Sequence, residues 1–180
     1  KIKLFDSVGN MGTDVPVSGT LVIDTSTPQI TVTTNITEWK NTNKPTVGGT
    51  VNDANIDSIK LYKGAQTVGS ETATDLIHTI NAPLNNNQWK IENTHWESAQ
   101  SNAGLNLSDG KEEKLTIIAT DKAGNTLAET ISLNIDTNVP TVTITSPNDN
   151  STEFVNRPTI TGSVPVTNTE SPITITFKIG

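Results

Sequence analysis

The chain has 180 residues, with 12 Lys and Arg against 19 Asp and Glu and a net charge of −7. This acidic balance argues against a nucleic-acid partner, because a phosphate backbone needs clustered basic side chains. Cysteine is absent, which excludes disulfides and thiolate metal sites. Nothing resembles a signal peptide, and no apolar run reaches membrane-spanning length.

Short strands joined by turns are predicted along the chain, which is rich in Thr, Asn, Ser, Val and Ile. The first residues have the pattern of a strand interior and lack an initial Met, so we interpret the chain as a fragment of a longer protein. Period-two alternation then predicts seven strands, lettered A to G in chain order. Their marker residues are Ile30 and Val32; Val47, Gly49 and Val51; Ile59 and Leu61; Leu76, Ile77 and Ile80; Trp89 and Ile91; Leu115, Ile117 and Ala119; Ile131, Leu133 and Ile135. The pattern is typical of an all-β, seven-stranded antiparallel sandwich of immunoglobulin (Ig) type.

One segment breaks the strand pattern. THWESAQSNAGL (94–105) opens on Thr94, has Glu97 three residues later and closes on Gly104. Thr followed by Glu at this spacing is a capping box, and Gly commonly ends a helix. We therefore predict a short helix over residues 94–105, between strands E and F.

Three motifs occur twice in the same order. DSVGN (6–10) matches DKAGN (121–125), IDTSTPQITV (23–32) matches IDTNVPTVTI (135–144), and NKPTVGGTV matches NRPTITGSV. The last two pairs are offset by 112 and 113 positions, which predicts tandem domains of about 110 residues. The boundaries follow: residues 1–24 are the last hairpin of one domain, 25–136 are a complete domain, and 137–180 are the first strands of a third.

A family resemblance rests on motifs of the complete repeat: LSDG (107–110), KLTIIATDKAGN (114–125), IDT (135–137) and Pro140, with Trp89 before them. Together they resemble the bacterial Ig-like domains strung in tens of copies along giant secreted adhesins and biofilm-associated surface proteins. The resemblance covers nearly the whole chain and departs from the usual pattern between Trp89 and residue 109. It implies a stalk repeat of a secreted or cell-surface protein that mediates cell adhesion or biofilm formation. Its partners would be neighbouring repeats, and a host or matrix receptor bound through other regions.

The resemblance also implies calcium ions that stiffen the domain junctions, and the residues themselves favour such a site. An Ig-type sandwich gathers the linker, the loop 52–57 and the turn 121–125 at one pole. Oxygen ligands expected there are Asp24, Asp53, Asp57, Asp121 and Asn125. Calcium takes six to eight oxygens, and clustered carboxylates without a cation would repel one another.

The next junction offers a second set of oxygen ligands. Asp136 lies on the linker, Asp109 on a loop of the complete domain, and Glu170 on a loop of the third domain. In the partial first domain, Asp6 and Asn10 occupy the positions of the later turn. We predict that these residues also hold calcium.

Turn chemistry is the alternative explanation for the same acidic residues. Asp and Asn are ordinary turn residues, and D-x-x-G-N forms a hairpin turn with its Gly at positive φ. For the turn 121–125 both interpretations stay open, and for the loop 52–57 the turn interpretation is favoured. The Asp before Thr in both linkers favours the cation. No EF-hand loop is present, and the two histidines, His78 and His95, lie 17 residues apart with no Cys to complete a zinc site.

We expect no enzyme, because the nucleophile elbow, the Walker loop, H-E-x-x-H and a Cys nucleophile are missing. Carbohydrate binding is the alternative function, since exposed aromatic rings on a sandwich can stack on sugars. The candidates are Trp39, Trp89, Trp96 and Tyr62. Alternation with Ile91 predicts that Trp89 lies in the core, and Trp96 is predicted to pack the helix onto the sandwich. Trp39 has no predicted place.

Overall fold

The computed structural model describes residues 3–14, 19, 22–97, 105–147, 156–157, 159–165 and 174–178, and only the backbone of Glu97 and Lys111. This part of the chain is predominantly β. The strands are β1 (Gln29–Val32), β2 (Trp39–Lys40), β3 (Val47–Asn52), β4 (Ile56–Lys63), β5 (Leu76–Asn81), β6 (Gln88–Ile91), β7 (Gly110–Asp121), β8 (Thr126–Ile135), β9 (Thr143–Ser146) and β10 (Thr161–Ser163). The helices are α1 (Asn93–Glu97) and the 3-10 turns η1 (Ala73–Asp75) and η2 (Asn85–Asn87).

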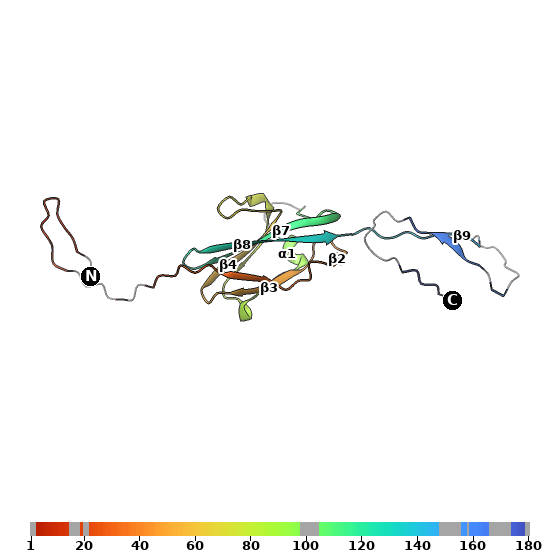
Figure 1. Cartoon of the computed structure of the whole chain (residues 1–180), viewed down its shortest axis with the longest axis horizontal. Helices are drawn as coiled ribbons and strands as arrows, with labels where there is room; N and C mark the ends of the chain where they lie inside the picture. The colour runs from red at the N-terminus through yellow and green to blue at the C-terminus, as the bar shows by residue number, and fades with distance from the viewer. Residues whose placement is uncertain are drawn as a thin grey trace.

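Two sheets face one another across a common core between residues 29 and 135 (Figure 1). One has the order β1-β3-β6 and the other the order β2-β8-β7-β4-β5. All pairs are antiparallel except β2 and β8, which run parallel. A separate two-stranded sheet pairs β9 with β10. Figure 1 shows the turn near the N-terminus, the two sheets and β9 following one another along the longest axis.

The predicted strands A to G correspond to β1, β3, β4, β5, β6, β7 and β8, so all seven positions are confirmed. One strand was not predicted: β2 carries Trp39 and pairs with the end of β8. The predicted strand D is β5, and it pairs with β4. In an Ig-type sandwich strand D pairs with strand E, whose place β6 takes, in the other sheet. The prediction that this segment is an Ig-type strand D was therefore wrong.

The core is built from the alternating apolar residues of both sheets. They are joined there by Trp96 of α1 and by Leu107, and the fully buried members include Val47, Ile59, Leu61, Ile77, Ile91, Leu115, Ile117, Leu133 and Ile135. Gly49 is buried in β3, between its neighbouring strands β1 and β6 of the same sheet. A Cβ at Gly49 would overlap the carbonyl oxygen of Thr31 and lie 2.9 Å from the indole of Trp89. Glycine is therefore required in β3 for steric reasons, not for a special φ.

The helix α1 begins earlier than the sequence predicted. Its first residue is Asn93, so Thr94 lies inside the helix and the capping box proposed for it is wrong. Glu92 caps the helix instead: its carbonyl accepts the His95 N–H at 3.0 Å, and its own N–H donates to His95 Nδ1 at 2.9 Å. Imidazole takes the place that Glu or Gln has in a capping box. The predicted continuation over residues 98–104 lies outside the described residues, and residues 105–108 are irregular.

The sheet β9-β10 repeats the geometry of β1-β3. Thr31 pairs with Thr50 and Val32 with Gly49, and the residues aligned with them pair likewise, Thr143 with Ser163 and Ile144 with Gly162. A Cβ at Gly162 would lie 2.5 Å from the Thr143 carbonyl oxygen, just as one at Gly49 would meet Thr31. The repeated sequence thus forms the same strand register twice.

Candidate functional site at the two joints

The turn between β7 and β8 is organised by the carboxylate of Asp121. Its Oδ1 accepts the N–H groups of Ala123 at 2.9 Å and Asn125 at 2.8 Å, and its Oδ2 accepts the Asn125 side-chain amide at 2.8 Å. Gly124 takes a φ of 92° and donates its N–H to the Asp121 carbonyl at 3.1 Å. An Asp followed three residues later by a Gly that tolerates positive φ is what this turn needs.

Asp121 is buried, with 2% of its surface exposed. Burial raises the pKa of this carboxyl, but hydrogen bonds from Asn125, Ala123 and Gly124 outweigh burial and lower it below the ordinary value. The charged form is therefore stabilised by the donors of its own turn.

The N-terminal joint, defined here as Asp24, Asn55 and the turn 121–125, connects the linker to two loops. The Asn125 amide donates to the Asp24 carbonyl at 3.1 Å, and the Asn55 amide lies 3.4 Å from Asp24 Oδ2. The Lys122 N–H donates to the Asn55 carbonyl at 2.9 Å. The Asp24 carboxylate also accepts the Ser26 N–H at 3.0 Å, which fixes the start of the linker. Residues up to 101 positions apart thus meet at this joint.

Asp53 and Asp57 lie beside this joint. Asp53 is in the connection from β3 to β4, whereas Asp57 is the second residue of β4 and not, as predicted, a loop residue. The half-buried Asp53 accepts the Asn55 N–H at 2.6 Å through Oδ1. Asp57 is exposed, and its backbone carbonyl accepts the Ala82 N–H at 2.8 Å. Both side chains line a hollow of about 480 Å³ together with Lys122. Asn55 therefore bridges Asp53 and Asp24, whereas Asp57 makes only a backbone contact.

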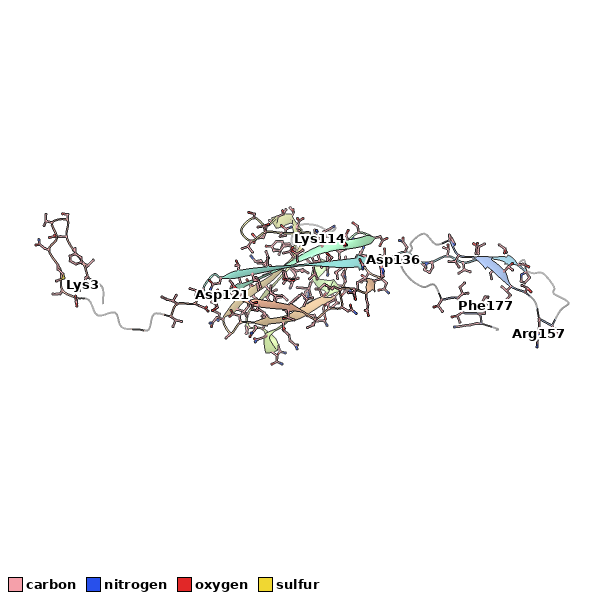
Figure 2. The ribbon with its side chains drawn as sticks, in the orientation of Figure 1. Lys3, Lys114, Asp121, Asp136, Arg157 and Phe177 are labelled. Atoms are coloured by element: carbon pink, nitrogen blue, oxygen red, sulfur yellow. The ribbon has the colours of Figure 1, made fainter. Side chains whose placement is uncertain are left out.

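The C-terminal joint, defined here as Asp109, Asp136 and Thr137, lies at the opposite end of the sheets; Figure 2 shows Asp121 and Asp136 at the two ends. Asp109 Oδ1 accepts both the N–H of Thr137 at 2.9 Å and its hydroxyl at 2.7 Å. These bonds from Thr137, with a smaller contribution from Asn138, lower the pKa of Asp109. Asp136 Oδ1 accepts the Asn138 N–H at 3.0 Å, and the Asp136 N–H donates to the Lys40 carbonyl at 2.9 Å.

Near the N-terminus, Asp6 forms the same turn as Asp121. Its Oδ1 accepts the N–H groups of Val8 at 3.0 Å and Asn10 at 2.8 Å, and its Oδ2 accepts the Asn10 amide at 2.7 Å. Gly9 has a φ of 90°. The hydrogen bonds from Asn10 lower the pKa of Asp6, which is exposed.

Within the described residues, no group of three or more His, Asp or Glu side chains lies close enough to hold a metal ion. Six of the predicted ligand carboxylates accept N–H donors from their own or neighbouring turns. They belong to Asp6, Asp24, Asp53, Asp109, Asp121 and Asp136. Glu170 lies outside the described residues. Turn chemistry thus accounts for the hydrogen bonds seen, and calcium stays a prediction.

The aromatic candidates do not form an exposed platform. Trp89 and Trp96 are each 2% exposed, and each donates its indole N–H to a backbone carbonyl, of Thr50 and Pro45 respectively. Their predicted core positions are confirmed. Tyr62 is also buried, and Trp39 is half-buried in β2.

Sequence reasoning missed two residues of the joints. Asn55 was not singled out, although its position two residues after Asp53 is the spacing of an Asx turn. Thr137 was noticed only as part of the repeated IDT, and its two donors to Asp109 give that Thr a structural role.

No protein-family model matches the chain, and a search of curated proteins also finds no match. Among the described residues, no helix has the length and apolarity to cross a membrane.

Proposed function

We propose that this chain is a stalk segment of a bacterial surface adhesin that mediates cell adhesion or biofilm formation. Residues 25–136 would be a complete Ig-like domain, and residues 1–24 and 137–180 would be parts of its neighbours. The observation that carries the proposal is the repetition of one geometry in this chain. The Asp6 turn copies the Asp121 turn, and β9-β10 copies β1-β3.

The order of the strands supports the Ig-like assignment. β1, β3 and β6 correspond to strands A, B and E, while β8, β7 and β4 correspond to G, F and C. The segment of strand A is divided: β1 pairs with β3, and β2 crosses to pair with β8. β5 then takes the C′ position beside C, as in variable-type Ig domains.

A stalk needs joints that limit bending, and both joints have direct contacts between linker and domain. At the N-terminal joint Asn125 binds the Asp24 carbonyl, and at the C-terminal joint Asp109 accepts two hydrogen bonds from Thr137. The longest strands run from one joint to the other, and ten residues of β8 span roughly 33 Å. Each further repeat would add a similar length to the stalk.

Small-angle X-ray scattering on the 180-residue chain tests the stalk proposal. We expect an elongated particle with a well-defined maximum dimension that does not change with salt. The matched variants Asn125→Ala and Thr137→Val should broaden the distance distribution, because each loses a joint hydrogen bond. A broad distribution in the unmodified chain would contradict a stiff stalk, and tight binding on a glycan array would favour the carbohydrate-binding alternative.

We further propose that calcium stiffens these joints. The oxygen chemistry of Asp24, Asp53, Asp109 and Asp136 supports this part, since calcium prefers carboxylate and backbone oxygens. A ligand that binds only the folded state raises the melting midpoint. We expect a higher midpoint in calcium than in chelator, and a smaller difference for Asp24→Asn. An unchanged midpoint would contradict the calcium sites and leave the stalk proposal standing.

A further inference from the structure

Two histidines stack on each other where the helix α1 meets the edge strand β5. The rings of His78 on β5 and His95 on α1 are stacked, with centroids 4.1 Å apart and planes inclined by 21°. Both side chains are half-buried. The stack connects the short helix directly to the sheet that contains the F and G strands.

The hydrogen bond at the start of α1 fixes the protonation state of His95. Its Nδ1 lies 2.9 Å from the N–H of Glu92 and accepts that proton. A ring nitrogen that accepts a hydrogen bond carries no proton, so this imidazole is neutral, with its proton on Nε2. Protonation of His95 Nδ1 would place one N–H donor opposite another, the Glu92 N–H. The hydrogen bond that caps α1 would then be lost.

The surroundings of the stack disfavour a positive charge on His78. Burial, and secondarily the electrostatic repulsion that a protonated His95 would exert, lowers the pKa of His78. Its neighbours Ile77 and Thr79 on β5 and its cross-strand partner Leu61 on β4 are uncharged. The nearby carboxylate of Glu92 is paired with Lys90 Nζ at 2.6 Å, and this pairing, with a smaller contribution from His95, lowers the pKa of Glu92.

We propose that His78 and His95 form a pH-sensitive latch that holds α1 on β5 at neutral pH and releases it in mild acid. Two stacked imidazolium rings would repel each other, and the protonated His95 would lose the Glu92 N–H. Release matters for the core, because α1 places Trp96 there with its indole N–H 3.1 Å from the Pro45 carbonyl. Because burial lowers the pKa of His78 in the folded chain, the unfolded chain binds that proton more readily, and the latch weakens as the pH falls below about 6.5.

Amide hydrogen exchange in the 180-residue chain tests the latch at the Glu92 N–H itself. Between pH 7.5 and 5.0 the protection factor of this amide should fall about tenfold, the effect of losing one helix cap. The matched variant is His95→Gln. Its amide oxygen, at the third helical position, accepts the same N–H at any pH as in a capping box. Glu92 should therefore keep its protection in this variant at pH 5.0.

A second measurement keeps the test decisive if that variant folds poorly. Nitrogen-15 spectra of the imidazoles should show an unprotonated Nδ1 on His95 at pH 7.5, and His78→Gln should keep the Glu92 cap at neutral pH but weaken the acid response. An equal loss of protection in the unmodified chain and in His95→Gln would overturn the latch. So would a proton on His95 Nδ1 at pH 7.5.

Discussion

The turns at Asp6 and Asp121 have the same hydrogen bonds in different surroundings. In both, the Asp carboxylate accepts two backbone N–H groups and one Asn amide, and a Gly takes φ near 90°. Asp6 is exposed, whereas Asp121 is buried and its Asn125 continues to the Asp24 carbonyl. The five-residue sequence is therefore sufficient for the turn, and tertiary contacts decide how much the turn contributes to the stability of the domain.

The same contrast applies to the two glycines, and here we expect the largest effect. Gly49→Ala places a Cβ against the Thr31 carbonyl and the Trp89 indole inside a closed core. It should lower the free energy of unfolding by about 3 kcal/mol or more, measured by urea denaturation. Gly162→Ala meets the Thr143 carbonyl and the backbone of Ile144, both in an exposed sheet. The urea midpoint should be unchanged in this control, and a matching loss in both variants would show that the two sheets unfold as one unit.

The two aspartates provide the second test. Asp121→Ala removes the acceptor of three partly buried hydrogen bonds and leaves their N–H donors without this partner. We expect the thermal midpoint of the main transition to fall by several degrees. Asp6→Ala removes the same acceptor from an exposed turn outside the two sheets, so the midpoint should stay constant. Equal shifts of the thermal midpoint in the two variants would mean that the local hydrogen bonds, and not the burial of the Asp, determine how much each turn contributes to stability.

The strands and the D-x-x-G-N turns could be predicted from sequence because their determinants are local. Alternation of apolar residues marks each strand, and Asp and Gly at fixed spacing mark each turn. The place of β5 could not be read in this way, since pairing with β4 or β6 depends on which sheet edge the chain reaches. Trp39 shows the same limit, because β2 is two residues long and exists only through its pairing with β8.

The joints were only partly predictable for a related reason. The sequence predicted that Asp24, Asp121 and Asn125 lie at one pole of the sandwich. In the structure, Asn125 is hydrogen-bonded to both aspartates. Asn55 joins Asp53 to Asp24, through its backbone N–H and its side-chain amide respectively, and no repeat or charge pattern marks this residue. Carboxylates that the predicted topology brings to one pole therefore suggested a cation, while the hydrogen bonds that these carboxylates make come from N–H donors of the turns themselves.

Acid titration separates the two turns through their carboxylates. Hydrogen bonds lower the pKa of both Asp6 and Asp121 in the folded chain, so the unfolded chain binds these protons first as the pH falls. The Asp121 contribution is present above about pH 4 and is lost below it. Urea midpoints between about pH 5 and 3 should therefore fall less steeply in Asp121→Asn than in the unmodified chain. Asp6→Asn should leave the slope as it is, because the Asp6 turn lies outside the two sheets whose unfolding sets the urea midpoint.

The smallest effect is expected at the C-terminal joint. Thr137→Val removes the hydroxyl that lies 2.7 Å from Asp109 Oδ1 and keeps the backbone N–H to the same oxygen at 2.9 Å. Because this pair is exposed, the free energy of unfolding should change by less than about 0.5 kcal/mol. The motion of the joint should respond more, since the hydroxyl is one of two bonds that fix the linker. Residual dipolar couplings of residues 136–138 should decrease in the variant, and unchanged couplings would mean that the backbone bond alone orders the joint.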